Sequence, residues 1–249
     1  MHSAPGTRTQ RLADAPASSR IHIDWDGIAP TSWYARVGQK LLDLAVGIVV
    51  IPLAILPLAA ISLANWASFG DWRKILFIQA RVGYRGRVFW IYKFRTMTDA
   101  TESNMNSWSN GGDMKRVTKF GKLLRSTHID ELPQLINVVL GDMAFIGPRP
   151  EMLEIETWAA EHIEGFSERL AMRPGLTGYA QITQGYTGRD IDAYREKLAI
   201  NQYYRRNQTL KTDIEILLRT ACWVMRGKGW DWKLQAATAT EEDRETGAA

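Results

Sequence analysis

Two adjacent carboxylates, Asp130 and Glu131, are the residues of this 249-residue sequence best suited to do chemistry. An apolar pattern with the helical spacing i, i+3, i+4, i+7 and i+8 follows them, at Leu132, Leu135, Ile136, Val139 and Leu140. Pro133 fits only the first turn of a helix, so we expect the helix to begin near Asp130–Leu132. The amino end of a helix favours anions, so the pair could face one pocket as nucleophile and metal ligand. The alternative is a solvent-exposed N-cap.

Basic residues that could bind phosphate lie on both sides of this pair. Residues 115–125 hold five bases and no acid, which indicates either a solvated helix face or a patch that faces phosphates. Arg149 stands between Pro148 and Pro150. The stiff backbone there would present its guanidinium to a diphosphate as a fixed fork, or hold it in water as part of a rigid connector. The turn-rich segment 173–178 could be a nucleoside loop, although turn chemistry alone explains its composition.

One element that could position these residues is an uncharged run of 21 residues, Leu44 to Ala64. As a helix it would reach about 31 Å, the hydrocarbon thickness of a bilayer. Pro52 and Pro57 should bend or break it. Basic residues flank the run on both sides, which predicts a re-entrant helix that enters and leaves one leaflet rather than a straight span. A buried core helix is the other interpretation.

The composition limits what the rest of the chain can be. A net charge of +4, 23% charged residues and a mean hydropathy of −0.23 exclude a polytopic membrane protein. One cysteine and four histidines exclude a disulfide framework and a Cys/His metal cluster. The basic run lacks the stacking aromatics of a single-strand binder, so no nucleic-acid partner is expected.

The predicted fold class is α+β, a helix-rich membrane-associated domain with a small β-hairpin and one re-entrant membrane helix. A β-rich stretch at Val88–Phe94 predicts the hairpin. Further helices are expected at Leu153–Leu170 and around Ile214–Met225, the latter either as core or at a membrane surface. We divide the chain into a flexible N-terminal tail (1–35), a re-entrant membrane helix (36–70), a cytosolic domain (71–233) and a disordered acidic tail (234–249).

Five motifs together carry a family resemblance: KFRTM (93–97), RSTHIDELPQLINVVLGDM (125–143), FIGPRP (145–150), RPGLTGYAQI (173–182) and RGKGW (226–230). In this order they resemble the bacterial sugar transferase family, the monotopic polyprenyl-phosphate phosphoglycosyltransferases, in its short form. The resemblance implies transfer of a sugar 1-phosphate from a UDP-sugar to undecaprenyl phosphate, with release of UMP, at the start of exopolysaccharide, O-antigen or capsule assembly. It also implies attachment to inner membrane lipids, with the catalytic domain on the cytoplasmic face.

The resemblance also assigns roles to individual residues. It makes Asp130 the nucleophile of a covalent phosphosugar intermediate and Glu131 the ligand of Mg²⁺. Arg125 and Arg149 match the phosphate-binding arginines of the family, and Lys93 and Arg95 are weaker candidates for the same work. The chain departs from the family where it has Asn201-Gln202-Tyr203-Tyr204 in place of Asp-x-Tyr-Tyr, and where Ser68–Trp72 follows the membrane helix.

Two other functions use different features of the sequence. Asp190 and Asp192 form an Asp-x-Asp pattern, the metal and nucleotide signature of many UDP-sugar glycosyltransferases, which would release UDP. A non-enzymatic, basic, membrane-anchored binding protein would use the same positive charge, but it leaves the acid pair unexplained. The sequence does not identify the sugar, whose selectivity we place around Thr183–Arg189, and it leaves the glycan pathway and the formation of homo-oligomers open.

Overall fold

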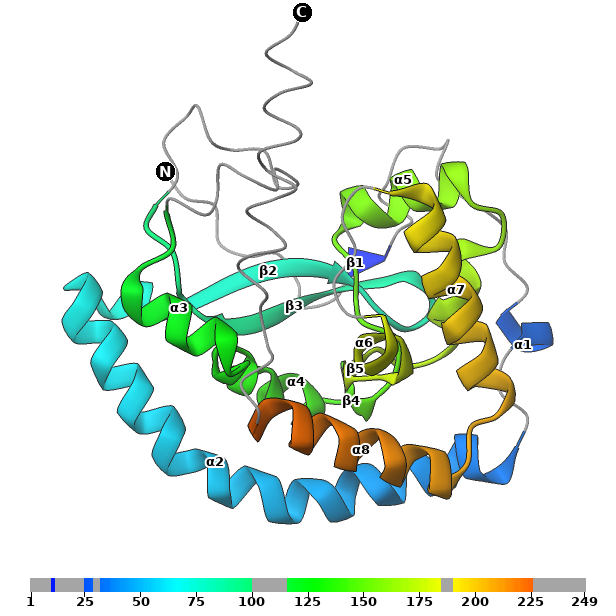
Figure 1. Ribbon diagram of the computed structural model, residues 1–249, viewed down its shortest axis with the longest axis horizontal. Helices are drawn as coiled ribbons and strands as arrows, with labels where there is room; N and C mark the ends of the chain where they lie inside the picture. Colours follow the sequence, from blue (N-terminus) through cyan, green and yellow to red (C-terminus); the bar gives the residue numbers. More distant parts are fainter. Residues whose placement is uncertain (1–9, 12–24, 29–31, 100–115, 185–189, 226–249) are drawn as a thin grey trace, which may run out of the picture.

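The computed structural model describes residues 10–11, 25–28, 32–99, 116–184 and 190–225 (Figure 1). Most of the predicted N-terminal tail, residues 100–115, the RGKGW motif and the acidic tail lie outside the described residues. A long helix, α2, follows one side of the molecule, and α8 lies beside it. A β-hairpin crosses the middle of the molecule, with α3 toward one end and α5 and α7 toward the other.

In chain order the elements, with η for short 3₁₀ or π helices, are β1 (Gln10–Arg11), α1 (Trp25–Ile28), η3 (Tyr34–Gly38), α2 (Gln39–Phe69), η4 (Trp72–Lys74), β2 (Leu76–Val82), η5 (Tyr84–Gly86), β3 (Arg87–Phe94), α3 (Lys119–Ser126), η8 (Ile129–Gln134), α4 (Leu135–Val139), β4 (Ala144–Ile146), α5 (Leu153–His162), η9 (Phe166–Ala171), β5 (Gly175–Thr177), α6 (Tyr179–Thr183), α7 (Ile191–Arg206) and α8 (Leu210–Met225). The described residues are therefore mainly helical with two small sheets, as predicted.

The predicted hairpin is confirmed. β2 and β3 pair antiparallel from Val82 opposite Val88 to Leu76 opposite Phe94. β1 pairs with the other edge of β3, so the sheet order is β1-β3-β2. Gly86 has a φ of 72°, a left-handed conformation that glycine adopts without steric cost. This turn sets the register that carries Lys93 toward the middle of the molecule.

α2 is one continuous helix that contains both Pro52 and Pro57, so the predicted break is absent. The helix instead follows a curve along the domain (Figure 1). Each proline removes only one backbone hydrogen bond from a helix of 31 residues, and tertiary contacts hold both of its ends. The 36-residue stretch Tyr34–Phe69 is long and apolar enough to cross a membrane and is mostly exposed. The alternative of a buried core helix is therefore wrong.

Both ends of α2 are hydrogen-bonded to the same globular body. Near its start, Gln39 Nε2 donates to Ile146 O over 2.7 Å. Near its end, Asn65 Nδ2 donates to Ile75 O and Arg95 O, each over 3.0 Å. Gln39 and Asn65 are buried although their neighbours on α2 are largely exposed. Polar side chains thus fix the path of an otherwise apolar helix.

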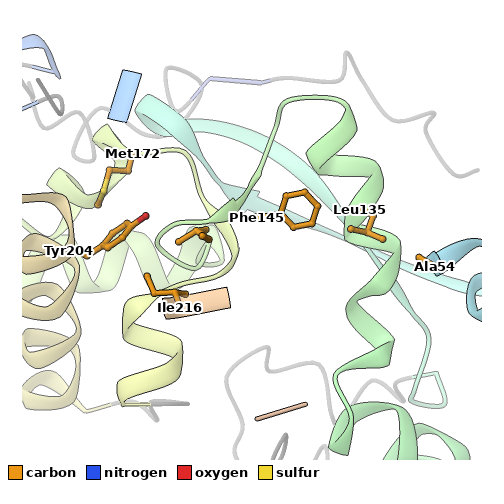
Figure 2. Close-up of a cluster of buried hydrophobic side chains, with 7 residues drawn as sticks. Ala54, Leu135, Phe145, Met172, Tyr204 and Ile216 are labelled. Atoms are coloured by element: carbon orange, nitrogen blue, oxygen red, sulfur yellow. The ribbon is translucent and has the colours of Figure 1, made fainter. Parts of the chain in front are cut away.

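The main core joins α2, α4, α7 and α8 to the short sheet formed by β4 and β5. Figure 2 shows its buried side chains, which are Ala54, Leu135, Phe145, Ile146, Met172, Tyr204 and Ile216. α8 therefore contributes to the core through one face. Its opposite face is apolar and exposed, with Leu210, Ile214 and Leu218. The core interpretation of this helix is confirmed, and its position at a membrane surface stays a prediction.

The predicted helix at Leu153–Leu170 is interrupted. α5 ends at His162, and the chain resumes as the 3₁₀ helix η9 after Gly165. Gly165 has a φ of 73°, which an α-helix does not allow. The apolar pattern continues across the interruption because Ile163 and Phe166 pack in the same cluster as Ile155. The apolar pattern therefore does not mark the helix end, which comes where Ile163 adopts an extended backbone with φ −133° and ψ 109°.

A two-stranded parallel sheet joins two motifs that are distant in the sequence. β4 belongs to FIGPRP and β5 to RPGLTG, and Ile146 lies opposite Thr177. A Cβ at Gly147 would lie 2.2 Å from the carbonyl oxygen of Arg173, and one at Gly175 would lie 2.0 Å from the nitrogen of Gly147. The backbones approach so closely that only glycine fits at either position. This contact places the Pro-Arg-Pro segment.

Candidate active site

Asp130 and Glu131 lie in the first turn of η8, a 3₁₀ helix that leads into α4. The predicted amphipathic helix is therefore α-helical only from Leu135. His128, at a φ of 55°, starts the turn, and its carbonyl accepts a hydrogen bond from the Glu131 amide. Asp130 is 8% exposed and Glu131 is 6% exposed. The alternative of a solvent-exposed N-cap is therefore wrong, because both carboxylates are buried.

Two cations hold the Glu131 carboxylate. Arg149 forms a bidentate pair with it, Nη2 to Oε1 at 2.5 Å and Nη1 to Oε2 at 3.1 Å. Lys93 Nζ donates to Oε1 over 2.8 Å. Lys93, from β3, therefore has a central place in the site. Such charge-assisted bonds are the strongest in proteins and fix the geometry of all three side chains.

The two carboxylates differ in their electrostatic surroundings. Burial would raise the pKa of Glu131, but Arg149 and Lys93 outweigh it and hold that pKa well below its usual range. Burial and the charge of Glu131 raise the pKa of Asp130 to about 6. The Asp130 carboxylate has no hydrogen bond or ion pair to another described residue. One acid is thus a fixed anion, and the other is available for chemistry.

Asn137 holds the acid-bearing segment against the hairpin. Its Nδ2 donates to Trp90 O over 2.7 Å, and its Oδ1 accepts from the backbone nitrogen of Tyr92 over 3.3 Å. Asn137 is completely buried. It therefore joins α4 to the edge of β3 beside Lys93 and sets the spacing between that lysine and Glu131.

The other two predicted phosphate ligands lie in different surroundings. Arg125 donates from Nε to Thr96 Oγ1 over 3.0 Å, and its charge lowers the pKa of Asp130 against the effect of burial. Arg125 is therefore close enough to act on the site. Arg95 pairs instead with the exposed Asp99 at 2.8 Å. The structure does not bring Arg95 to the acid pair.

The Asp-x-Asp pattern has a structural explanation. Asp190 is the N-cap of α7, where its Oδ1 accepts from the backbone nitrogens of Asp192 and Ala193. Asp192 is exposed and pairs with Arg195 at 2.9 Å. An N-cap of this kind stabilises the helix start. The two carboxylates thus have local partners, and nothing in the described region makes them a nucleotide site.

The donor atoms near the acid pair suit Mg²⁺. No group of three or more His, Cys, Asp and Glu suited to a metal occurs in the described part of the chain. Mg²⁺ is commonly held by one or two carboxylates together with substrate phosphates and water. Among the described residues, Glu131 Oε2 accepts only one hydrogen bond, from Arg149, so it could accept a further ligand. These oxygens could bind the ion when a diphosphate supplies the remaining ligands.

Two residues near the site were not among the candidates that the sequence offered. The ring of His128 lies 5.2 Å from that of Trp223 on α8, and burial lowers the pKa of this histidine. Arg81 of β2 lies close enough to interact with the charges of Glu131 and Arg149, and burial lowers its pKa to about 10. No spacing in the sequence marks either residue. Arg81 reaches the site through the packing of β2, and His128, at the start of η8, meets Trp223 through the packing of α8.

Comparisons with known proteins bear on the family of the chain. Residues 34–227 match the family described as bacterial sugar transferase. The UDP-N-acetylgalactosamine-undecaprenyl-phosphate N-acetylgalactosaminephosphotransferase of Aeromonas hydrophila is 37% identical over 203 residues, 81% of this chain and 47% of that protein. The uncharacterized sugar transferase EpsL of Bacillus subtilis is 36% identical over 174 residues, 70% of this chain and 79% of that protein.

A third relative is the UDP-glucose:undecaprenyl-phosphate glucose-1-phosphate transferase of Caulobacter vibrioides. It is 39% identical over 147 residues, 58% of this chain and 54% of that protein. The chain thus spans about half the length of the Aeromonas and Caulobacter relatives. The family match runs from the start of the long apolar helix through every described element after it. The chain belongs to the bacterial sugar transferase family.

Proposed function

We propose that the chain transfers a sugar 1-phosphate from a UDP-sugar to undecaprenyl phosphate, with release of UMP, through a phosphosugar intermediate on Asp130. The observation that carries the proposal is the asymmetry of the buried acid pair, in which Glu131 is neutralised by two cations and Asp130 is not. The names of the Aeromonas and Caulobacter relatives supply the donor and acceptor classes. A panel of UDP-sugars would identify the sugar that is transferred.

The transfer takes place in two displacements. A carboxylate oxygen of Asp130 attacks the sugar-bearing phosphorus of the donor, and the bond between that phosphorus and the bridging oxygen breaks, so that UMP leaves with the electron pair. An oxygen of the lipid phosphate then attacks the same phosphorus, and the acyl phosphate bond breaks to release Asp130. The second step restores the carboxylate, and no redox partner is needed.

Charged groups around Asp130 would stabilise these steps. Arg149 and Lys93 bind Glu131, which follows Asp130 in the sequence. From there their positive charges can offset the charge of the donor diphosphate. Arg125, whose charge lowers the pKa of Asp130, would add positive charge at the same site. Glu131, whose Oε2 could accept a further ligand, would help to hold Mg²⁺. When bound, Mg²⁺ supplies positive charge to the diphosphate and to the leaving UMP.

The direct test is the identity of the nucleotide product. Incubation of the chain with a panel of UDP-sugars, Mg²⁺ and undecaprenyl phosphate should release UMP with at least one donor, because the phosphorus and not the sugar carbon is attacked. Chromatography separates UMP from UDP. Release of UDP would contradict the mechanism, and it would favour a glycosyltransferase. Removal of Mg²⁺ with EDTA should stop UMP release.

The proposal includes attachment to the cytoplasmic face of the inner membrane through α2. A straight helix of 31 residues would reach about 46 Å. A helix that spanned the bilayer would place its far end on the opposite side from the domain. Both ends instead bond to one body, through Gln39 and Asn65, which supports a helix that enters and leaves the same leaflet. The exposed apolar face of α8, beside α2 in Figure 1, would face the same membrane.

Cysteine labelling tests this topology. In a Cys222→Ser background, Ser19→Cys and Ser68→Cys place single thiols before and after the apolar run. Both should resist a membrane-impermeant maleimide in intact cells and react once the cells are opened, because both ends of α2 would lie in the cytoplasm. Labelling of only one of the two in intact cells would support a spanning helix and contradict the re-entrant one.

A further inference from the structure

The segment Pro148–Glu151, which carries Arg149, is held by its carbonyl groups. Pro148 O accepts from the nitrogen of Gly175 over 3.0 Å, and Glu151 O accepts from the nitrogen of Val82 over 2.9 Å. Between them, two arginine side chains take the remaining carbonyls. Arg169 Nη1 donates to Arg149 O over 3.1 Å, and Arg81 Nη1 donates to Pro150 O over 3.4 Å.

The two prolines explain why the carbonyls matter. Proline has no amide hydrogen, so a Pro-Arg-Pro segment loses two of the donors by which a strand is normally held. Four partners on three elements, β2, η9 and β5, take four successive carbonyls instead. The backbone of Arg149 is therefore fixed in space, and its guanidinium reaches Glu131 from a defined origin.

Of the two arginines, Arg169 is the more deeply buried. It is 4% exposed, and it pairs with the buried Glu156, whose other oxygen accepts from Ser167 Oγ over 2.9 Å. Its guanidinium lies over the ring of Phe166, 4.6 Å from the ring centroid. Burying such an ion pair is seldom more stabilising than apolar packing of the same volume, so stability alone is a weak explanation for it.

We propose that Arg169 is a positioning residue, which acts on catalysis only through the backbone of Arg149. This inference rests on the proposed function, since the role of Arg149 is to neutralise phosphate charge beside Asp130. Arg169 touches neither acid of the site. Its two anchors, the Glu156 carboxylate and the Arg149 carbonyl, require a planar fork with several donors, and a lysine ammonium is a single point of charge that cannot reproduce this geometry.

A double-mutant cycle tests this role. Arg169→Lys should lower kcat/KM for the UDP-sugar by about 10- to 100-fold, because small displacements of a positioning group have effects of that size. In an Arg149→Ala background the same substitution should change kcat/KM by less than about twofold, since the group that it positions is gone. Its effect on the melting temperature should be equal in both backgrounds.

A merely structural role gives a different pattern. The losses in kcat/KM from Arg169→Lys and from Arg149→Ala would then multiply in the double variant, and this result would overturn the proposal. Arg205→Lys is the matched control, because Arg205 pairs with Glu168 and has no contact with residues 148–151. It should leave UMP release within about twofold of wild type. Ser167→Ala, which removes only the hydrogen bond to Glu156, gives a milder variant for the same cycle if Arg169→Lys does not fold.

The cycle also separates the two proposals. If the wild-type chain releases no UMP from any UDP-sugar, the proposed function fails and the positioning role fails with it. If the wild type releases UMP and the two losses multiply, only the positioning role fails. If the wild type releases UMP and Arg169→Lys has no added effect in the Arg149→Ala background, both are supported.

Discussion

Asp130→Asn should abolish UMP release and at the same time stabilise the fold. The amide is no nucleophile, so the covalent mass increment that the wild type gains from a UDP-sugar should be absent in intact-protein mass spectrometry. The pKa of Asp130 is raised from 3.8 to about 6 in the folded chain, so ionised Asp130 opposes folding at pH 7. Without Mg²⁺, the variant should be more stable by on the order of 1 to 3 kcal/mol.

The pH dependence of this gain has a defined sign. A raised pKa gives stability below the unfolded value of 3.8, and that stability is lost as the pH rises through about 6. The difference in melting temperature between variant and wild type should therefore shrink as the pH falls from 7 toward 4. Asp192→Asn is the control, since Asp192 is exposed, and it should change neither quantity. Full activity of Asp130→Asn would disprove the nucleophile assignment.

Glu131→Gln should also abolish UMP release, but it should destabilise the fold. Lys93 and Arg149 would lose their shared carboxylate and remain as uncompensated buried charges. Removal of one partner of a buried pair costs about 3 to 5 kcal/mol. Because the pKa of Glu131 is held well below its usual 4.5, its charge stabilises the fold at neutral pH, and this stability is lost as the pH falls below 4.5.

Chemical denaturation at pH 7 measures this loss. Glu215→Gln is the matched control, because Glu215 pairs with Arg219 on the exposed face of α8 and should contribute less than about 1 kcal/mol. A higher free energy of unfolding in Glu131→Gln than in wild type would contradict the prediction, because Lys93 and Arg149 would then not need this carboxylate. Two adjacent acids with opposite effects on stability would separate the reacting group from the fixed anion.

The acid pair illustrates how far the sequence alone could predict the site. Asp130 and Glu131 are adjacent, so their position at a helix start indicated one shared pocket or an exposed N-cap, and the family resemblance assigned their roles. Their burial and the contact between Lys93 and Glu131, 38 positions apart, depend on the packing of β3 against η8. Arg95 was an equal candidate to Lys93 in the sequence, but the structure pairs it with Asp99. Lys93 and Arg95 are two positions apart, so alternation along a strand does not separate them. β3 ends at Phe94, and only the packing of the chain after that residue directs Arg95 to Asp99.

The sequence by itself determined the elements that depend on near neighbours. A β-rich stretch predicted the hairpin at Val88–Phe94, and the long apolar run predicted α2, because both signals lie in consecutive residues. The tertiary structure alone decided that α2 continues through its prolines, since polar anchors at both ends hold its path. It also decided that Arg149 meets Glu131, because four partners on β2, η9 and β5 fix the carbonyls of residues 148–151. Contacts of this kind join residues whose separation along the chain carries no periodic signal, so they arise only when the chain is folded.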